Sequence, residues 1–252
     1  MGHQPGLPGI PDLLGRVINR WIEDPVPRLM ASLLMGGAFF VLGLGAAMEF
    51  YLGMFLALLP AVIVEEPALL GVGIGVLFLV VFPALFLSMS TAQAVFQSGA
   101  IGALVRRQTQ EVPLTWRSSL SELGPRTKGY VAHALVVSGA SVVLVFLGFI
   151  PALVLWVAVP LSLPGMVLYG WSTRESLERA VKFAAQEPLW HLGLFGALVM
   201  VNLVLAYVPL LGVGLAILFV AELNVEACIA AFGPATRSDL LPPDSPEEAA
   251  PG

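Results

Sequence analysis

The sequence predicts an all-α integral membrane protein, a bundle of six transmembrane helices in three hairpins with short amphipathic interfacial helices. Composition is the first reason: 58% of the 252 residues are hydrophobic and 12% are charged, with a mean hydropathy of +0.89. Soluble proteins carry about a quarter charged residues, so we expect lipid to be the solvent for most of this chain. The second reason is a set of uncharged runs, each long enough to cross a bilayer core of about 30 Å.

Two terminal segments are expected to lie outside the membrane domain, which we place at residues 12–235. Residues 1–11 are rich in proline and glycine, and residues 236–252 form an acidic, proline-rich tail. Both compositions are typical of disordered segments, because such chains cannot bury enough apolar surface to fold.

Three short amphipathic segments precede the apolar runs. In the first, residues 12–24, apolar residues recur at a spacing of three and four while Arg16 and Arg20 take the opposite side. This periodicity predicts a helix in the membrane interface. The second segment is residues 114–124, and the third begins at Ser172, whose spacing to Glu175 is that of a capping box.

The first apolar region is longer than a simple hairpin. Leu29–Met48 is an uncharged run of twenty residues, sufficient for one span, and Glu49 follows it. Phe50–Val64 is short for a span and contains a proline, so we expect a re-entrant or interfacial piece. Residues 67–104 form a second span that is bent at Pro83 or extends past the interface. A reading with eight spans, which also splits residues 67–104, keeps both ends of the chain on the same side.

The remaining spans form two regular hairpins. Residues 129–170 contain no Lys, Arg, Asp or Glu and divide near Gly148 into two spans. Leu189–Tyr207 and Pro209–Phe232 are spans five and six. Each hairpin follows a proline and turns near a Leu-Gly pair, which is the pattern of an internal repeat. In the six-span arrangement all twelve Lys and Arg residues fall on one side, so the positive-inside rule places both termini in the cytoplasm.

Two carboxylates inside the last span are the candidate functional residues. Glu222 lies halfway along it, near the expected membrane midplane, and Glu226 is one turn further on the same face. Ionisable residues at this depth are rare and mark ion or substrate sites, or pair with a neighbouring group. The candidate polar partners are residues of the second span with three- and four-residue spacing and two histidines at span ends: Ser90, Gln93, Gln97, His133 and His191. Across a hairpin, His191 is placed to reach Glu226.

Several classes of function are disfavoured by what the sequence lacks. A single cysteine, Cys228, excludes an internal disulfide and a cysteine metal cluster. There is no phosphate-binding loop, zinc-protease motif or nucleophile elbow, so we expect no cofactor and no enzymatic activity. The expected partners are the lipid bilayer and either another membrane protein or a second copy of the chain. Nucleic acid is not an expected partner. The net charge of −5 says little here, because in a membrane protein the position of the Lys and Arg residues matters more.

One region resembles a known group of membrane proteins. The run PLSLPGMVLYGWSTRESLERAVKFAAQEPLW is similar to bacterial polytopic families that include the membrane domain accompanying some glycerophosphoryl diester phosphodiesterases. The matching residues are Pro160, Pro164, Gly170, Leu177 and Trp190. Ala180 and Val181 stand where these families usually have Ser-Trp. The resemblance implies a six-helix fold of the bacterial inner membrane, and it implies no phosphodiesterase activity because that domain is missing.

These observations leave two hypotheses for function. The first is a non-catalytic accessory or scaffold subunit that binds lipid or a protein partner through its basic cytoplasmic face. The second is a transporter or channel for a small solute that uses Glu222 and Glu226. An intramembrane enzyme is a third hypothesis without a visible pair of nucleophile and base.

Overall fold

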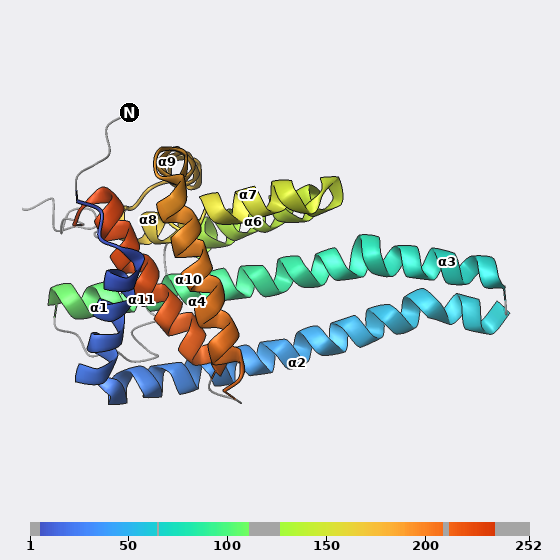
Figure 1. Ribbon diagram of the computed structural model, residues 1–252. Helices are drawn as coiled ribbons and strands as arrows, with labels where there is room; N and C mark the ends of the chain where they lie inside the picture. Colours follow the sequence, from blue (N-terminus) through green and yellow to red (C-terminus); the bar gives the residue numbers. More distant parts are fainter. Residues whose placement is uncertain (1–5, 65, 111–126, 209–211, 235–252) are drawn as a thin grey trace, which may run out of the picture.

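The computed structural model describes residues 6–64, 66–110, 127–208 and 212–234, and every regular element in these ranges is a helix (Figure 1). In chain order they are α1 (Ile10–Glu23), α2 (Pro25–Val64), α3 (Pro67–Val76), the π-helical turn η1 (Leu77–Val81), α4 (Phe82–Gln110), α6 (Thr127–Leu147), α7 (Phe149–Ala158), α8 (Ser162–Tyr169), α9 (Thr173–Gln186), α10 (Pro188–Ala206) and α11 (Gly212–Phe232).

Within these ranges, six helical stretches are long and apolar enough to cross a membrane. They are residues 25–64, 67–105, 127–147, 149–169, 188–205 and 212–232. The predicted all-α class and the six apolar helices are therefore confirmed. This combination indicates a multi-pass membrane protein.

The expectation for Phe50–Val64 is wrong. These residues do not form a separate re-entrant or interfacial piece, because they continue α2, which is one helix of 40 residues. At 1.5 Å per residue α2 is about 60 Å long. Pro60 lies inside it, only one turn before its end, where a proline disturbs few backbone hydrogen bonds. A continuous helix satisfies the backbone donors and acceptors of these residues within the chain itself.

The second long run also stays helical past its proline. The π-helical turn η1 ends two residues before Pro83 and joins α3 to α4 without a break. A proline removes one donor and its ring crowds the preceding turn. A locally widened turn accommodates both effects, and π-bulges are common sites of helix bending. The expected irregularity at Pro83 is thus a widened turn within one continuous helical path.

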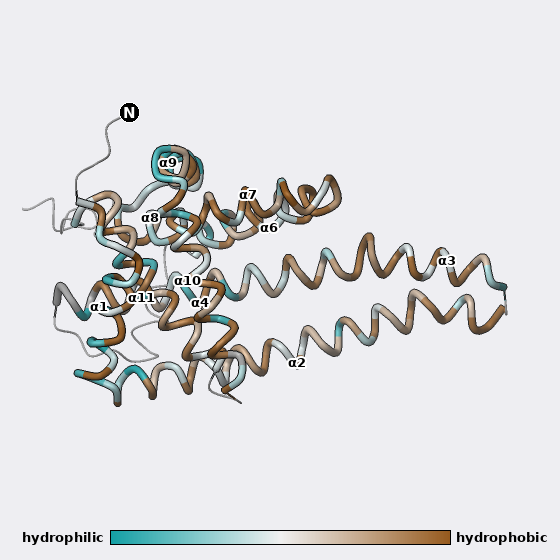
Figure 2. Tube along the Cα trace, in the orientation of Figure 1, coloured by the Kyte–Doolittle hydropathy of each residue, from teal (hydrophilic) through white to brown (hydrophobic). Residues whose placement is uncertain are grey.

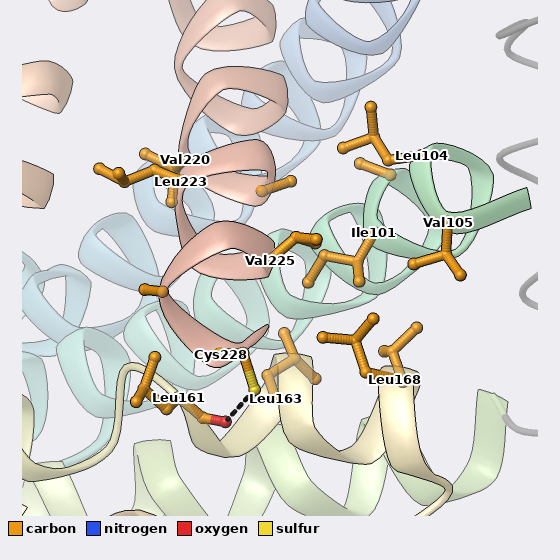
Figure 3. Close-up of a cluster of buried hydrophobic side chains, with 14 of the residues drawn as sticks. Ile101, Leu104, Val105, Leu161, Leu163, Leu168, Val220, Leu223, Val225 and Cys228 are labelled. Atoms are coloured by element: carbon orange, nitrogen blue, oxygen red, sulfur yellow. Dashed lines mark hydrogen bonds between the residues drawn. The ribbon is translucent and has the colours of Figure 1, made fainter. Parts of the chain in front are cut away.

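The helices differ greatly in how much of their surface the protein itself covers. α11 packs against α1, α2, α4, α8 and α10, and 67% of its apolar window is buried. Only 6% of the corresponding window in α2 is buried. Figure 3 shows the cluster around α11, formed with side chains of α4 and α8: Ile101, Leu104, Leu161, Leu163, Leu168, Val220, Leu223, Val225 and Cys228.

The arrangement in space is a body with one long projection. α2 and α3–α4 lie side by side and extend well beyond the other helices (Figure 1). α6 and α7 follow a similar direction and end much earlier, whereas α10 and α11 cross α2 steeply. Apolar residues continue along the whole projection, with few polar interruptions (Figure 2).

Two of the three amphipathic segments are helices in the described ranges. α1 begins at Ile10, two residues before the predicted start, and buries Leu13 and Val17. α9 begins as its capping box predicts, because the Ser172 hydroxyl accepts a hydrogen bond from the Glu175 backbone N–H at 3.3 Å. The segment at residues 114–124 lies outside the described residues.

Candidate functional site

Glu222 is paired with an arginine from the start of α2. The Arg28 Nε donates to the Glu222 Oε1 at 2.7 Å, and both side chains are buried. Arg28 sits in the first turn of α2, so Glu222 lies level with the beginning of this long helix. α11 reaches this position because it crosses α2 steeply (Figure 1). The charge of Glu222 is thereby balanced inside the bundle, as charged groups in membranes require.

A second carboxylate extends this pair into a network. The Arg28 Nη1 donates to the Asp24 backbone oxygen at 3.0 Å and lies 3.6 Å from the Asp24 Oδ2. Arg107, near the end of α4, also forms an ion pair with the Asp24 carboxylate. Through this chain of contacts the ends of α1, α2 and α4 are joined to the middle of α11.

Glu226 is held by the amphipathic helix α1. The Arg20 Nη1 lies 2.6 Å from the Glu226 Oε1, and the Arg16 Nε lies 3.7 Å from the Glu226 Oε2. Arg16 and Arg20 are one turn apart and therefore share a face of α1. The sequence pattern placed this face away from the apolar side, and the structure shows that it also reaches α11. Leu13 and Val17 pack beside these contacts in the hydrophobic core.

The polar stripe of α4 lies elsewhere, around a cavity of about 460 Å³. Ser90, Gln93 and Gln97 line it, as their spacing on one helical face predicted. Its other walls come from α6, α7, α8, α10 and α11. Glu222 and Glu226 are not among its described lining residues; Asn224 is, because a residue two positions away points to the opposite side of a helix.

Several polar groups of this cavity are already fixed by internal hydrogen bonds. The Ser162 Oγ and the His133 Nε2 are 3.0 Å apart, and the Ser162 hydroxyl donates to the Val159 carbonyl at 2.7 Å. The Trp156 indole N–H donates to the Ser141 Oγ at 3.0 Å. Because the Ser162 proton is engaged by a carbonyl, His133 acts as the donor to Ser162 in this arrangement. This is the reverse of the polarity that a serine nucleophile requires.

No family model, curated protein or solved structure matches this chain. What the protein does must therefore be inferred from its two polar arrangements and its shape. Among the described residues, no group of three or more His, Cys, Asp or Glu side chains is placed to hold a metal ion.

His191 belongs to neither arrangement. Its ring is fully buried and packs against Phe183 and Trp190, with ring centroids 5.2 and 5.6 Å apart. Within the described part of the chain, both of its ring nitrogens lack a hydrogen-bond partner. The expected approach of His191 to Glu226 is therefore not observed, and Glu226 has arginine partners instead.

The residues singled out in the sequence thus separate into three places. Glu222 and Glu226 belong to an ion-pair network, Ser90, Gln93 and Gln97 line the cavity, and His191 sits in an aromatic cluster. Sequence reasoning missed the role of Arg28 because a basic residue beside an apolar run is usually counted with the adjacent loop. An arginine in the first turn of one span and two glutamates within another indicated that an ion pair between spans was available, but not which residues would form it.

Proposed function

We propose that this protein is a non-catalytic accessory or scaffold subunit of the bacterial inner membrane, which binds another membrane protein through its long hairpin. The observation that carries the proposal is the length and exposure of α2 and α3–α4. These two helical runs project from the body, and only 6% of the most apolar 18-residue window in each run is buried.

Two charged residues indicate which part of the hairpin lies within the lipid bilayer. Arg28 and Glu49 are 21 residues apart on α2, which corresponds to about 32 Å of helix. This length matches a bilayer core of about 30 Å. We therefore assign these two side chains to opposite interfaces, so that Glu222, which pairs with Arg28, lies near an interface and not near the midplane as expected from the sequence. The rest of α2, with α3 and η1, then extends beyond the far interface.

The projecting part is apolar on its outer surface. Its exposed side chains include Leu52, Phe55, Leu56, Val62, Ile63, Val64, Leu70, Val72, Phe78, Leu79 and Val80. Leaving such an area in water costs about 25 cal/mol for each Å², and large exposed apolar patches mark interaction surfaces. An apolar helical surface of a partner membrane protein is the occupant that fits this shape. The internal packing of Gly73 against the Ala57 backbone keeps the two helices of the projection together.

The alternative of a solute pathway through Glu222 and Glu226 has less support. Each carboxylate is engaged by at least one arginine, which is the arrangement of a structural connection between helices. These two carboxylates engage three basic residues of the proposed cytoplasmic side, Arg16, Arg20 and Arg28, and Asp24 engages a fourth, Arg107. A basic-face contact with lipid then rests on the remaining cations, such as those of α9.

Shortening the projection tests the proposal. Deleting residues 52–62 and 70–80 removes eleven residues from each helical run, about three helical turns, and so preserves the phase of both helices. We expect the shortened chain to insert into the membrane and to unfold at the same temperature as the wild type. On a native gel of solubilised host membranes, however, it should migrate without the partner. A chain with Val136→Ser and Val143→Ser, two exposed positions on α6, is the control that should keep the complex.

Cysteine crosslinking identifies the occupant. Cys228 is buried, so Ile63→Cys on the projection and Val136→Cys on α6 can be compared in the presence of the native residue. An adduct to a different membrane protein at position 63 alone is the expected result. Three results would contradict the proposal. The first is an adduct only to a second copy of the chain, and the second is labelling of both positions by a lipid-borne reagent. The third is a native complex that is unchanged after the projection is shortened.

The proposed orientation has both termini in the cytoplasm. It rests on the positive-inside rule applied to the six apolar helices. A green fluorescent protein fused to the C-terminus should fluoresce, and alkaline phosphatase fused at the same place should be inactive. The opposite pair of results would overturn this orientation.

A further inference from the structure

The cavity beside α4 has the size of a ligand site. Its volume of about 460 Å³ lies within the range of about 300–1,000 Å³ typical of small-molecule pockets. Five separated parts of the chain supply its walls, and many of the lining residues are polar: Ser90, Gln93, Gln97, His133, Ser138, Ser141, Ser162, Asn202 and Asn224. Hydrogen bonds within the protein account for only some of these groups.

Two of the buried polar residues have atoms without a partner. Asn224 is 6% exposed and its Oδ1 makes no hydrogen bond, and His133 is 3% exposed and its Nδ1 makes none, within the described part of the chain. Buried polar atoms are nearly always satisfied, because leaving one unpaired costs much of its hydration energy. Both residues line the cavity. The two unpaired atoms themselves have almost no accessible surface, so a ligand with hydroxyl groups donates to them once these side chains turn toward the cavity.

The charge of the lining restricts the ligand. Among the described residues that line the cavity there is no Asp, Glu, Lys or Arg. A charged ligand in an apolar membrane interior requires a counter-charge. The nearest carboxylates on α11, Glu222 and Glu226, already have arginine partners and face away from the cavity. The ligand must therefore be uncharged.

Part of the cavity lining is apolar and reaches the protein surface. Phe86, Val199 and Leu203 line it and are each exposed, and they belong to helices that the membrane surrounds. A ligand entering between them passes directly from lipid. The hydrocarbon part of the ligand can stay against these side chains while its polar head reaches Asn224 and His133.

We infer that this cavity binds the hydroxyl-bearing head of an uncharged amphiphile, a lipid of the diacylglycerol class. The polar wall then supplies hydrogen bonds to the free hydroxyl and the ester oxygens, and the apolar rim holds the chains. This site is separate from the projecting hairpin, so the inference does not depend on the proposed binding of a partner protein.

Photolabelling in nanodiscs tests the site. The full chain is placed in phosphatidylethanolamine and phosphatidylglycerol with a trace of diacylglycerol that carries a diazirine on one acyl chain. Labelled peptides are then mapped by mass spectrometry. We expect labels on α4, α6 or α10 at residues around the cavity. Phosphatidylglycerol with the same diazirine also contacts the exposed rim from the bulk lipid, but it should label the residues around the cavity much more weakly than diacylglycerol does.

Two independent variants check that the cavity is responsible. Asn224→Leu removes a polar partner, and Ala94→Phe fills space in the cavity without removing a polar group. Each should lower diacylglycerol labelling about fivefold or more, the change expected for one lost hydrogen bond or for blocked entry. Asn19→Leu on α1 and Ala47→Phe on α2, both at exposed positions, are the matched controls and should label like the wild type.

Three results would overturn the inference. One is labelling of the cavity by the phosphatidylglycerol probe as strongly as by the diacylglycerol probe. Another is unchanged labelling in Ala94→Phe when that variant elutes as a folded, monodisperse protein. The third is displacement of the probe by excess glycerol alone, which would assign the site to a water-soluble polyol.

Discussion

Arg28 and Glu222 lie 194 positions apart in the chain and form a buried ion pair of 2.7 Å between the start of α2 and the middle of α11. Among the six apolar stretches of the described residues, the pair joins one of the two least buried to the most buried. In lipid, apolar surfaces give little preference for one helix neighbour over another, so polar contacts set the position of helices. The pair therefore fixes how α11 crosses α2, and with it the walls of the cavity on the opposite face of α11.

Removing the charge of Glu222 should destabilise the protein strongly. Glu222→Gln leaves the buried Arg28 guanidinium with only the more distant Asp24 carboxylate, and breaking a buried ion pair costs about 3–5 kcal/mol. Unfolding by sodium dodecyl sulfate in bicelles measures this loss. Glu49→Gln, at an exposed position of α2, should leave the unfolding midpoint unchanged.

A double variant separates the ion pair from its surroundings. Arg28→Met with Glu222→Met removes both charges and keeps similar volumes, so it should recover most of the stability lost in Glu222→Gln. A double variant as unstable as the single one would show that the two residues act through separate contacts. Equal midpoints for Glu222→Gln and Glu49→Gln would refute the structural role of the pair.

Removing the charge of Glu226 should release α1 and leave the rest folded. The arginines that bind Glu226 are partly exposed, with 49% and 34% of the side-chain surface of Arg16 and Arg20 accessible, so the pair is worth only about 1 kcal/mol. Brief trypsin digestion should cut Glu226→Gln after Arg16 or Arg20 faster than the wild type. High salt should have the same effect on the wild type by screening these charges. A digestion rate that neither change alters would mean that Leu13 and Val17 alone hold α1.

The sequence was sufficient to predict the helical class and the six apolar helices, because these depend on local properties of the chain. Leu29–Met48 and residues 129–147 are uncharged at the right length, and Ser172 with Glu175 carries its own helix-start signal. The length of the first hairpin was not predictable in this way. A single glutamate at position 49 and a proline at position 60 suggested an interruption, but neither overcomes the gain from a continuous backbone hydrogen-bond pattern.

The candidate site was predicted only in part because its contacts are long-range. The spacing of Ser90, Gln93 and Gln97 is a local property, and the structure places all of them at one cavity. The partners of Glu222 and Glu226 depend on which helices cross α11. Nothing in the local sequence says that Arg28 and Arg20 are closer to these carboxylates than His191 is.

The start of α9 offers a test of local stability. In the Ser172→Ala chain the Glu175 backbone N–H loses its acceptor, and the loss of an N-cap costs about 1 kcal/mol. We expect faster hydrogen exchange across the first turn of α9 and no change in α10 or α11. Ser172→Asp, which also accepts at this position, should restore protection. If Ser172→Ala exchanges like the wild type, the packing of Ala180 and Phe183 is sufficient to hold the helix.

A small side chain at position 214 is required where α11 meets α2. A Cβ added to Gly214 would overlap the Ser32 carbonyl oxygen and approach the Gly36 backbone nitrogen, so the two helices would have to separate. Overpacking of this kind costs about 1–3 kcal/mol, which exceeds the gain of about 1 kcal/mol from replacing glycine by alanine within a helix. Gly214→Ala should therefore lower the unfolding midpoint in bicelles. Gly196→Ala in α10, where an added Cβ meets no atom within 4 Å, should raise it or leave it unchanged.

Because separation of α2 and α11 also pulls Arg28 away from Glu222, the effects of Gly214→Ala and Glu222→Gln should not add in the combined variant. Full additivity would show that the close approach at Gly214 and the ion pair stabilise the protein independently.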